Sequence, residues 1–360
     1  MRNWILSLFI CSLCCLPASA SACREVIVSN EASGDLAVID PNADQVVARI
    51  PVGKRPRGMA LSPGREQLYV ALSGTPAAGP GVEKAGLPPA DKEADGIGVV
   101  DLTTRRLVRI IKGVSDPERV ALSSDGRRLF VASEDQGLVL MLDVRSGKSL
   151  ARTPVGAEAE GVDLSPGGIR VFATSEAEGR VSILDARSAT LMSQMPVGLR
   201  PRSTAFSPDG LRAYVANEAS GTISVLDTAA LRTVKTLHLP EGMLPMRVSV
   251  PRAGSPLYVS TGRGREVLAI DPRSGRVLEQ AESGARPWDM ALSSDDSELY
   301  VANGPSNDVS VFALPQLELR TRIHTGEKPW GVVCRDHWWA REGLLPTGVA
   351  SVAPRARQEK

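Results

Sequence analysis

A repeat of about 42 residues runs through most of the chain and limits what the chain can fold into. Each copy contains a short apolar strand, and successive copies are separated by 42, 61, 42, 42, 44 and 42 residues. The seven copies are VIVSN (26–30), LYVAL (68–72), LFVAS (129–133), VFATS (171–175), AYVAN (213–217), LYVST (257–261) and LYVAN (299–303). Because a short repeated unit buries its apolar face only against its neighbours, this spacing predicts a repeat architecture.

A second strand follows in each copy and, in six of the seven, ends on an aspartate. Alternating β-branched and small residues between Gly, Asp and Pro turns are typical of strands. Four strands in a unit of about 42 residues are the signature of a propeller blade. We therefore predict an all-β, seven-bladed β-propeller of four-stranded blades over residues 23–334. We interpret the strand-ending aspartates as turn residues that accept backbone N–H bonds; they are Asp40, Asp101, Asp143, Asp185, Asp227 and Asp271.

The two ends of the repeat region are incomplete in a complementary way. The first copy begins partway through a unit, and GEKPWGVVC (326–334) ends after a single strand. We predict that the C-terminal strand 330–334 pairs with the N-terminal strand 26–30 and closes the ring. Aligning the copies places Cys23 and Cys334 four positions apart across a hairpin turn, where Cβ atoms come within disulfide reach. We predict a disulfide between them, and the alternative is two unpaired thiols.

The N-terminus has the pattern of a targeting segment. Arg2 precedes the apolar run 4–16, and small residues follow at Ala18 and Ala20. This pattern predicts a signal peptide over residues 1–20, with a retained anchor as the alternative. We expect a periplasmic or secreted protein, because an oxidising compartment suits a disulfide. Residues 335–360 are predicted to form a C-terminal tail whose latter half is disordered.

Positive and negative charges nearly balance, with 42 Lys and Arg against 41 Asp and Glu. No global field favours a polyanion, so we expect no nucleic-acid partner. The mature chain has no apolar run of about 20 residues, so we also expect no transmembrane segment. We expect a monomer.

The segments that lead into the units contain the candidate ligand site. We interpret them as lead-in loops at one mouth of the central channel, and their second position varies from blade to blade. Their third and fourth positions are mostly apolar or small, as blade packing requires. The candidates at the second position are Arg57, Glu118, Glu160, Arg202, Met246, Trp288 and Trp330.

Two interpretations of this ring remain open. In the first, the two arginines grip a carboxylate bidentately and the two tryptophans sandwich a planar ring. In the second, the arginines pair with the two glutamates and the tryptophans cap the core below them. The first provides a ligand site at a concave surface with convergent polar groups, whereas the second leaves a structural plug.

One blade carries an insertion, residues 73–96, between two of its strands. Its proline, glycine and charged residues predict no regular structure. Long excursions from a rigid scaffold are often functional, and the alternative is a solvated loop without a partner. We expect the insertion on the same face as the lead-in loops.

No familiar catalytic or metal motif occurs in the mature chain. His238, His324 and His337 share no local motif, and no GxSxG, Cys/His pair or phosphate loop is present. We therefore predict no catalytic residue, no metal site and no cofactor from motifs alone.

The order of motifs within each repeat resembles the YVTN-repeat β-propeller family across residues 24–334, as in RPRSTAFSPDGLRAYVANEASGTISVLD (200–227). The stretch GARPWDMALSSDDSELYVANGPSNDVSVF (284–312), followed by GEKPWGVV (326–333), is similar to a narrower group of exported seven-bladed propellers. That group is associated with pyrroloquinoline-quinone-dependent alcohol oxidation. The resemblance implies the fold strongly and the function weakly, because propellers host many activities.

We predict from these features an exported, non-enzymatic propeller that binds a partner protein or a small anionic or planar ligand at one channel mouth. The resemblance implies an accessory role in periplasmic quinone-dependent alcohol oxidation. The alternative is a lactonase-like propeller enzyme, in which Glu118 or Glu160 acts with a channel-mouth arginine. That enzyme would need a carboxylate of raised pKa to transfer protons. A third hypothesis, a tetrapyrrole-handling propeller, requires a channel histidine that the second position does not offer.

Overall fold

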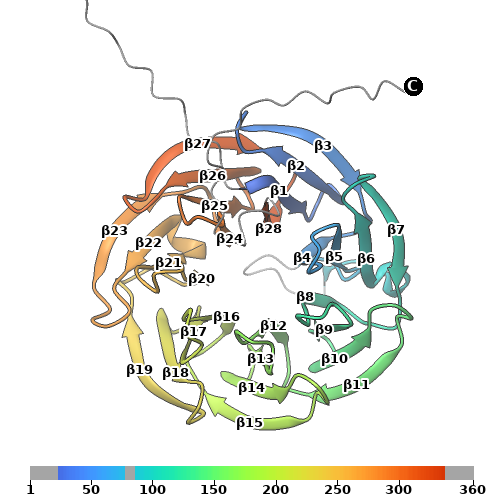
Figure 1. The fold of residues 1–360 in the computed structure, drawn as a ribbon, viewed down its shortest axis with the longest axis horizontal. Helices are drawn as coiled ribbons and strands as arrows, with labels where there is room; N and C mark the ends of the chain where they lie inside the picture. The colour runs from blue at the N-terminus through green and yellow to red at the C-terminus, as the bar shows by residue number, and fades with distance from the viewer. Residues whose placement is uncertain (1–22, 78–85, 337–360) are drawn as a thin grey trace, which may run out of the picture.

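The computed structural model describes residues 23–77 and 86–336, which form a ring of seven four-stranded antiparallel sheets (Figure 1). Each sheet is one blade, so the predicted seven-bladed β-propeller is confirmed. The predicted signal peptide (1–20), the centre of the insertion (78–85) and most of the predicted tail (337–360) lie outside the described residues.

Each blade runs from an innermost strand at the channel to an outer strand at the rim (Figure 1). The innermost strands are β4 (Pro56–Leu61), β8 (Pro117–Leu122), β12 (Ala159–Leu164), β16 (Pro201–Phe206), β20 (Arg247–Ser249), β24 (Pro287–Leu292) and β28 (Pro329–Asp336). The second strands are β1 (Cys23–Asn30), β5 (Gln67–Leu72), β9 (Arg128–Ser133), β13 (Arg170–Ser175), β17 (Arg212–Asn217), β21 (Leu257–Ser260) and β25 (Glu298–Asn303).

The remaining elements complete the blades. The third strands are β2 (Asp35–Asp40), β6 (Gly96–Asp101), β10 (Leu138–Asp143), β14 (Arg180–Asp185), β18 (Thr222–Asp227), β22 (Glu266–Ile270) and β26 (Asp308–Ala313). The outer strands are β3 (Gln45–Pro51), β7 (Arg106–Ile111), β11 (Ser149–Pro154), β15 (Leu191–Pro196), β19 (Arg232–His238), β23 (Val277–Glu282) and β27 (Glu318–His324). The single-turn 3-10 helices are η2 (Lys92–Ala94) and η3 (Gly262–Gly264).

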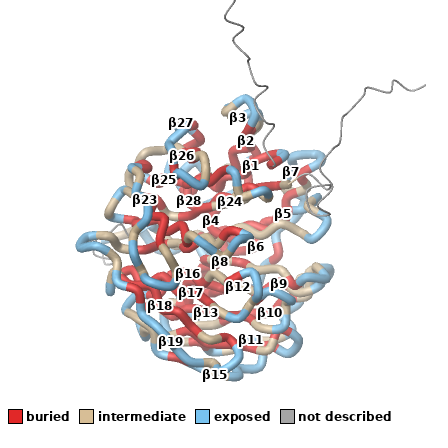
Figure 2. Tube along the Cα trace, turned by 60° about the vertical axis from the view of Figure 1, so that its left-hand side comes forward, coloured by how far each residue is buried: buried red, intermediate tan, exposed pale blue. Residues whose placement is uncertain are grey.

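Burial is greatest in the second and third strands of each blade and least in the outer strands at the rim (Figure 2). The second and third strands are buried on both faces between neighbouring blades, which is why they read as continuous apolar runs such as RVFATS and RVSILD. Outer strands such as β3 alternate between exposed and half-buried residues. The core is therefore a series of apolar layers between blades, and each blade is held by its two neighbours.

The segments interpreted as lead-in loops are in fact the innermost strands, so this interpretation was wrong except for residues 330–334, which were also predicted to form the closing strand. PRGMAL is the whole of β4, and it pairs with β5 along the channel. Its register shifts between Pro56 and Met59, so Arg57 lies in a bulge. The predicted site residues of β8, β12, β16, β24 and β28 also lie where the pairing is interrupted. Bulges commonly re-aim side chains next to functional sites.

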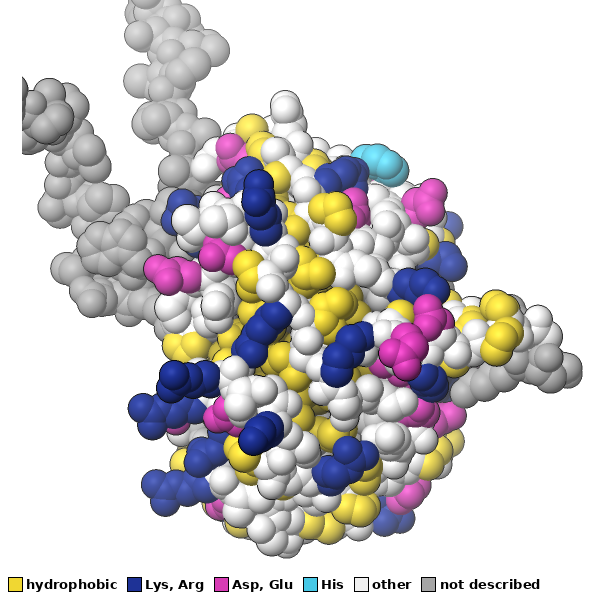
Figure 3. Space-filling model, turned by 90° about the vertical axis from the view of Figure 1, so that its right-hand side faces the viewer, with side chains coloured by type: hydrophobic (Ala, Val, Ile, Leu, Met, Phe, Trp, Pro, Cys, Tyr) yellow, Lys and Arg dark blue, Asp and Glu magenta, His cyan; other side chains and the backbone are white. Residues whose placement is uncertain are grey.

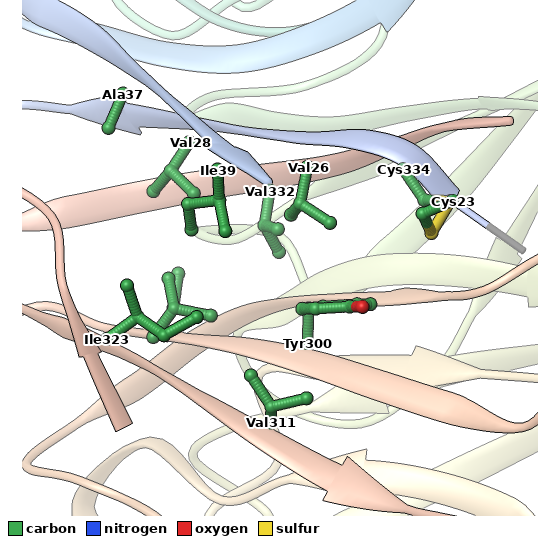
Figure 4. Close-up of a cluster of buried hydrophobic side chains, with 12 residues drawn as sticks. Cys23, Val26, Val28, Ala37, Ile39, Tyr300, Val311, Ile323, Val332 and Cys334 are labelled. Atoms are coloured by element: carbon green, nitrogen blue, oxygen red, sulfur yellow. A yellow bond between two sulfur atoms is a disulfide. The ribbon is translucent and has the colours of Figure 1, made fainter. Parts of the chain in front are cut away.

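The ring closes through one mixed blade that contains both ends of the propeller. Strand β28 pairs antiparallel with β1, with Val26 opposite Cys334, and this confirms the predicted closure. Both strands are longer than predicted, since β1 begins at Cys23 and β28 continues to Asp336. The Cys23–Cys334 disulfide is present, with a Cα–Cα distance of 5.6 Å. Figure 4 shows it at the edge of an apolar cluster that packs Val26 and Val332 towards Tyr300 of the neighbouring blade.

The repeated aspartates have the turn role that the sequence predicted. Asp185 accepts backbone N–H bonds from Arg187 at 2.8 Å and from Ser188 at 2.9 Å. Asp101 does the same for Thr103 and Thr104 at 2.8 Å. These bonds stabilise the ionised carboxylates, so the pKa of Asp101 and Asp185 lies below its usual value.

Figure 3 shows the face that carries β7 and β11, where side chains of both charges are scattered among apolar ones. This agrees with the near-neutral net charge of +1. Among the residues that the structure describes, no helix has the length and apolar character needed to cross a membrane.

Candidate functional site

A cavity of about 1120 Å³ opens at one mouth of the channel. Six of the seven predicted ring residues line it, namely Arg57, Glu118, Glu160, Arg202, Trp288 and Trp330. Met246 does not; it is 4% exposed and lies against the backbone of Gly262. The structure therefore brings together six candidates and excludes the seventh.

Arg57 is the centre of the first charged cluster. Its side chain is 2% exposed, and its Nη2 donates to Asp116 Oδ1 at 2.5 Å. It also contacts Glu118, and its Nη1 lies 3.6 Å from Glu134 Oε2. Burial disfavours the charge on Asp116, but Arg57 and the Ser73 hydroxyl outweigh burial and hold the pKa of Asp116 below its usual value.

Arg202 is the centre of the second cluster, and three carboxylates surround it. Its Nη1 lies 3.1 Å from Glu160 Oε1, and its Nη2 lies 2.7 Å from Glu218 Oε2. It also contacts Glu176, whose Oε2 accepts a bond from Arg200 at 2.7 Å. Two guanidinium groups therefore face three buried acids.

Glu176 has the most perturbed carboxyl group of this cluster. Burial, followed by the neighbouring charge of Glu160, raises its pKa to about 8, although Arg202 and Arg200 act in the opposite direction. The pKa of Glu218 is instead lowered, because Arg202 outweighs the burial of that carboxyl group. Glu176 is therefore largely protonated at neutral pH while Glu218 is ionised. Neighbouring carboxyl groups, one with a raised pKa and one with a lowered pKa, are typical of sites that transfer protons.

Both predicted arginine–glutamate pairs form, as the second sequence interpretation proposed. Arg57 pairs with Glu118, and Arg202 pairs with Glu160. The pairs do not fill the mouth, however, since all four side chains still line the cavity. The arrangement is a charged wall beside an open volume.

The sequence analysis missed a second ring of acids. Four blades place a glutamate directly after their second strand, and each belongs to an ion pair at the mouth. These residues are Glu31, Glu134, Glu176 and Glu218. The sequence shows these glutamates at the same place in four repeats, as the last residue of VSNE, VASE, ATSE and VANE. Comparing the residue that follows each second strand would have identified them.

A third set of residues precedes the innermost strands and has left-handed backbone conformation. Its six members are Arg55, Asp116, Glu158, Arg200, Arg286 and Lys328, with φ between 41° and 57°. Their carbonyl oxygens anchor the glutamate ring: Glu176 N–H donates to Glu158 O and Glu218 N–H donates to Arg200 O, both at 2.9 Å. Non-glycine residues in this conformation cluster at functional sites, where the surrounding structure holds them.

The two tryptophans do not form the predicted sandwich. Trp288 and Trp330 meet edge to face, with ring centroids 5.7 Å apart and planes at 65°. No parallel slot for a planar ring lies between them. Each instead stacks with an arginine, Arg286 over Trp288 at 4.8 Å and Arg119 over Trp330 at 4.7 Å. Arg286 lines the cavity and forms no ion pair with any described residue.

Below the mouth, charged residues cross the channel. The third positions of the innermost strands are mostly small, as the sequence analysis stated, and the exceptions are Arg119, Arg247 and Asp289. Asp289 lies 3.4 Å from Arg119 and 3.3 Å from Arg247, and Arg247 lies 3.4 Å from Asp163. This network, the channel floor, links four blades, and none of its four residues lines the cavity.

The insertion reaches the same face as the ring, as expected. Its described arms, residues 73–77 and 86–96, contribute Thr75, Pro76, Leu87, Pro88, Ala90 and Lys92 to the cavity lining. They include η2, one turn of 3-10 helix, so the prediction of no regular structure was wrong at that point. Lys92 Nζ bonds Asp135 Oδ2 of the next blade at 2.8 Å and fixes one arm.

The family model described as "Lactonase, 7-bladed beta-propeller" matches residues 149–321. A comparison with curated proteins finds no match. Among solved structures, a functionally unknown protein from Desulfotomaculum acetoxidans is 17% identical, with a TM-score of 0.69 over 87% of this chain and 99% of that chain. A "putative 6-phosphogluconolactonase" from Bacteroides fragilis is 15% identical, with a TM-score of 0.70 over 88% and 99% of the two chains.

A second "putative 6-phosphogluconolactonase", from Bacteroides uniformis, is 17% identical, with a TM-score of 0.67 over 86% of this chain and 98% of that chain. At these identities the structural likeness shows the fold. The family match goes further and contradicts our prediction of a non-enzymatic binding propeller. It fits the alternative, a lactonase-like propeller, so neither the binding role nor the accessory role in alcohol oxidation is carried further.

Proposed function

We propose that this protein is a lactonase-like hydrolase that opens a cyclic ester in the channel-mouth cavity, with Glu176 as its proton-transferring group. The observation that carries the proposal is a buried carboxyl group of pKa about 8 that lines the cavity between two arginines. The lactonase family match supports it, since residues 149–321 include Glu160, Glu176, Arg202 and Arg286. The sequence analysis named Glu118 or Glu160 as the carboxylate of raised pKa. In this proposal that carboxylate is Glu176, and Glu160 keeps a role as proton acceptor.

Hydrolysis of a lactone adds one water molecule across the ring ester. The water oxygen bonds to the carbonyl carbon, the carbonyl oxygen becomes negative in the tetrahedral intermediate, and the carbon–oxygen bond within the ring then breaks. One proton leaves the attacking water and one reaches the ring oxygen. The site therefore needs a proton acceptor, a proton donor and a stabiliser of the oxyanion.

The residues of the second cluster divide these roles among them. Glu176 holds a proton at neutral pH and is placed to give it to the ring oxygen. Glu160, beside it on Arg202, is placed to accept the proton of the attacking water. Arg286 lines the cavity without an ion pair among the described residues, so its guanidinium group can face the oxyanion.

The test is hydrolysis of lactones by the purified protein, followed by acid release in a pH-stat. We expect turnover of unsubstituted γ- and δ-lactones, with kcat/KM falling as the pH rises above about 8, because Glu176 then loses its proton. Glu176→Gln should lower kcat by about 100-fold or more, the range that general acid–base groups contribute. It should also abolish the alkaline limb of the pH profile.

Glu279→Gln is the matched control, because Glu279 is an exposed glutamate of the outer strand β23. This variant should retain the activity and the pH profile of the unaltered protein. Absence of hydrolysis in the unaltered protein, or an unchanged pH profile in Glu176→Gln, would reject the proposed function.

We also propose that the protein works in the periplasm or outside the cell. The Cys23–Cys334 disulfide supports this proposal, because disulfides persist in oxidising compartments. Intact mass of the protein recovered from a periplasmic fraction would test it, with loss of residues 1–20 and of two hydrogen atoms expected.

A further inference from the structure

The cavity is larger than the proposed reaction requires. Its volume of about 1120 Å³ slightly exceeds the range of about 300–1,000 Å³ typical of pockets for drug-sized ligands. A bare five- or six-membered lactone would leave most of it unfilled. The cavity therefore has room for a substituent on the ring, and its walls indicate the chemistry of that substituent.

The walls divide into a charged part and an apolar part. The charged part contains the Arg57 and Arg202 clusters, from the innermost strands and the residues next to them. The insertion arms instead face the cavity with Pro76, Leu87 and Pro88. Trp288 and Trp330 add flat apolar surface to the same volume.

The one cation that the insertion arms contribute to the cavity is neutralised. Lys92 Nζ lies 2.8 Å from Asp135 Oδ2 and 3.5 Å from Asp95 Oδ2. An anionic substituent at this wall would have to compete with both carboxylates for Lys92. The wall therefore favours an uncharged, apolar group.

The base of the insertion holds this wall in place. Asp91 N–H donates to Gly74 O at 2.9 Å, so the two arms pair where they leave the blade. Asp95, 2% exposed, accepts the Gly74 N–H at 2.7 Å and the Asp116 N–H of the next blade at 3.0 Å. A wall that is already ordered costs little conformational entropy when a ligand binds.

We infer that the substrate is a lactone whose ring carries an alkyl or aryl arm, and that this arm lies against Pro76, Leu87 and Pro88. The lactone part of this inference rests on the proposed function, whereas the apolar subsite rests on the geometry of the insertion arms. Leu87 is half-buried before any ligand binds, so a bound arm would remove further apolar surface from water. Burial of one methylene is worth about a fourfold gain in affinity.

The experiment measures binding separately from hydrolysis. We would measure the Kd of γ-lactams with no chain, a butyl chain or a hexyl chain by calorimetry. The Kd should fall about three- to fourfold for each methylene group of the chain that becomes buried. With the corresponding γ-lactones, kcat/KM should rise in the same proportion. Leu87→Asp should remove the dependence on chain length, and Leu87→Ala, a milder variant, should reduce it.

Leu211→Asp is the matched control, because Leu211 is 55% exposed in the β16–β17 turn and does not line the cavity. It should keep the full dependence on chain length. The apolar subsite is rejected if the Kd of the lactams does not change with chain length, or if Leu87→Asp keeps the same change of Kd with chain length as the unaltered protein. Either result rejects the subsite even if lactones are hydrolysed. Chain-dependent lactam binding without hydrolysis of any lactone supports the subsite and rejects the proposed reaction.

Discussion

Asp116 and Glu176 are both buried acids beside arginines, yet their pKa values move in opposite directions. Asp116 receives the Arg57 guanidinium and the Ser73 hydroxyl, and both stabilise its ionised form. Burial raises the pKa of Glu176, the neighbouring charge of Glu160 raises it further, and Arg202 and Arg200 do not offset these two effects. The balance between burial, hydrogen bonds and neighbouring charges therefore decides which acid keeps its proton.

The raised pKa of Glu176 makes stability depend on pH. The folded protein holds this proton up to pH about 8, whereas the unfolded chain releases it near the ordinary value of 4.5. Between these limits the folded state binds more protons, so the free energy of unfolding falls as the pH rises through this window. In Glu176→Gln this decline should be smaller, and the variant should gain stability relative to the unaltered protein from pH 5 to pH 8.

Urea denaturation at pH 5, 7 and 9 measures this difference. Glu279→Gln, which changes an exposed glutamate, should follow the curve of the unaltered protein at each pH. Parallel curves for Glu176→Gln and the unaltered protein would show that Glu176 ionises normally in the folded state.

At the scale of the element, the innermost strands explain why six of the sequence candidates line the cavity although most of their segments were interpreted as loops. Segments such as PRGMAL and PWGVVC begin with proline and mix charged, aromatic and glycine residues, which is typical of a loop. The neighbouring blades nevertheless bury most of each segment, and its hydrogen bonds go to the second strand. Residue 57 and its counterparts face the mouth because the pairing bulges there.

The insertion depends on one close backbone approach at Gly74. A Cβ at this position would lie 1.7 Å from Asp91 O, in the neck where the two arms pair. Gly74→Ala must therefore push the arms apart, and we expect the free energy of unfolding to fall by about 1–3 kcal/mol, as in other overpacked sites. Amide exchange in residues 86–96 should also become faster.

Gly64→Ala provides the comparison, since a Cβ at Gly64 would meet no atom within 4 Å. Its free energy of unfolding should change by no more than about 0.5 kcal/mol. Equal effects of the two substitutions would show that the neck of the insertion carries no packing constraint.

At the scale of the whole molecule, stability depends on how the ring closes. The disulfide joins residues 311 apart in sequence, so it constrains nearly the whole propeller in the unfolded state. The chain-entropy model gives roughly 6 kcal/mol for a loop of this length. Replacing both cysteines with serine should lower the free energy of unfolding by up to this amount and leave the fold unchanged.

Guanidinium denaturation of the double variant, with and without a reducing agent, measures the contribution of the disulfide. The reducing agent should destabilise the unaltered protein and have no effect on the variant. If the two proteins unfold at the same denaturant concentration under oxidising conditions, the hydrogen bonds and apolar contacts of β1 and β28 alone account for the closure.

The sequence alone determined the features that repeat. The number of blades, the pairing of the two ends, the disulfide and the turn aspartates all follow from local patterns that recur every 42 residues or so. Six residues of the cavity could also be predicted, because equivalent positions of a propeller converge on one mouth. The repeat pattern could not predict how the environments of equivalent residues differ from blade to blade.

Those differences arise only when the ring brings distant residues together. The pKa of Glu176 depends on Glu160 and Arg202, which lie on the innermost strands β12 and β16. The edge-to-face tryptophans and the channel floor likewise depend on contacts between blades. Sequence position sets which side chains meet at the mouth. Burial and the balance of neighbouring charges, which only the tertiary structure provides, decide which of them holds a proton at neutral pH.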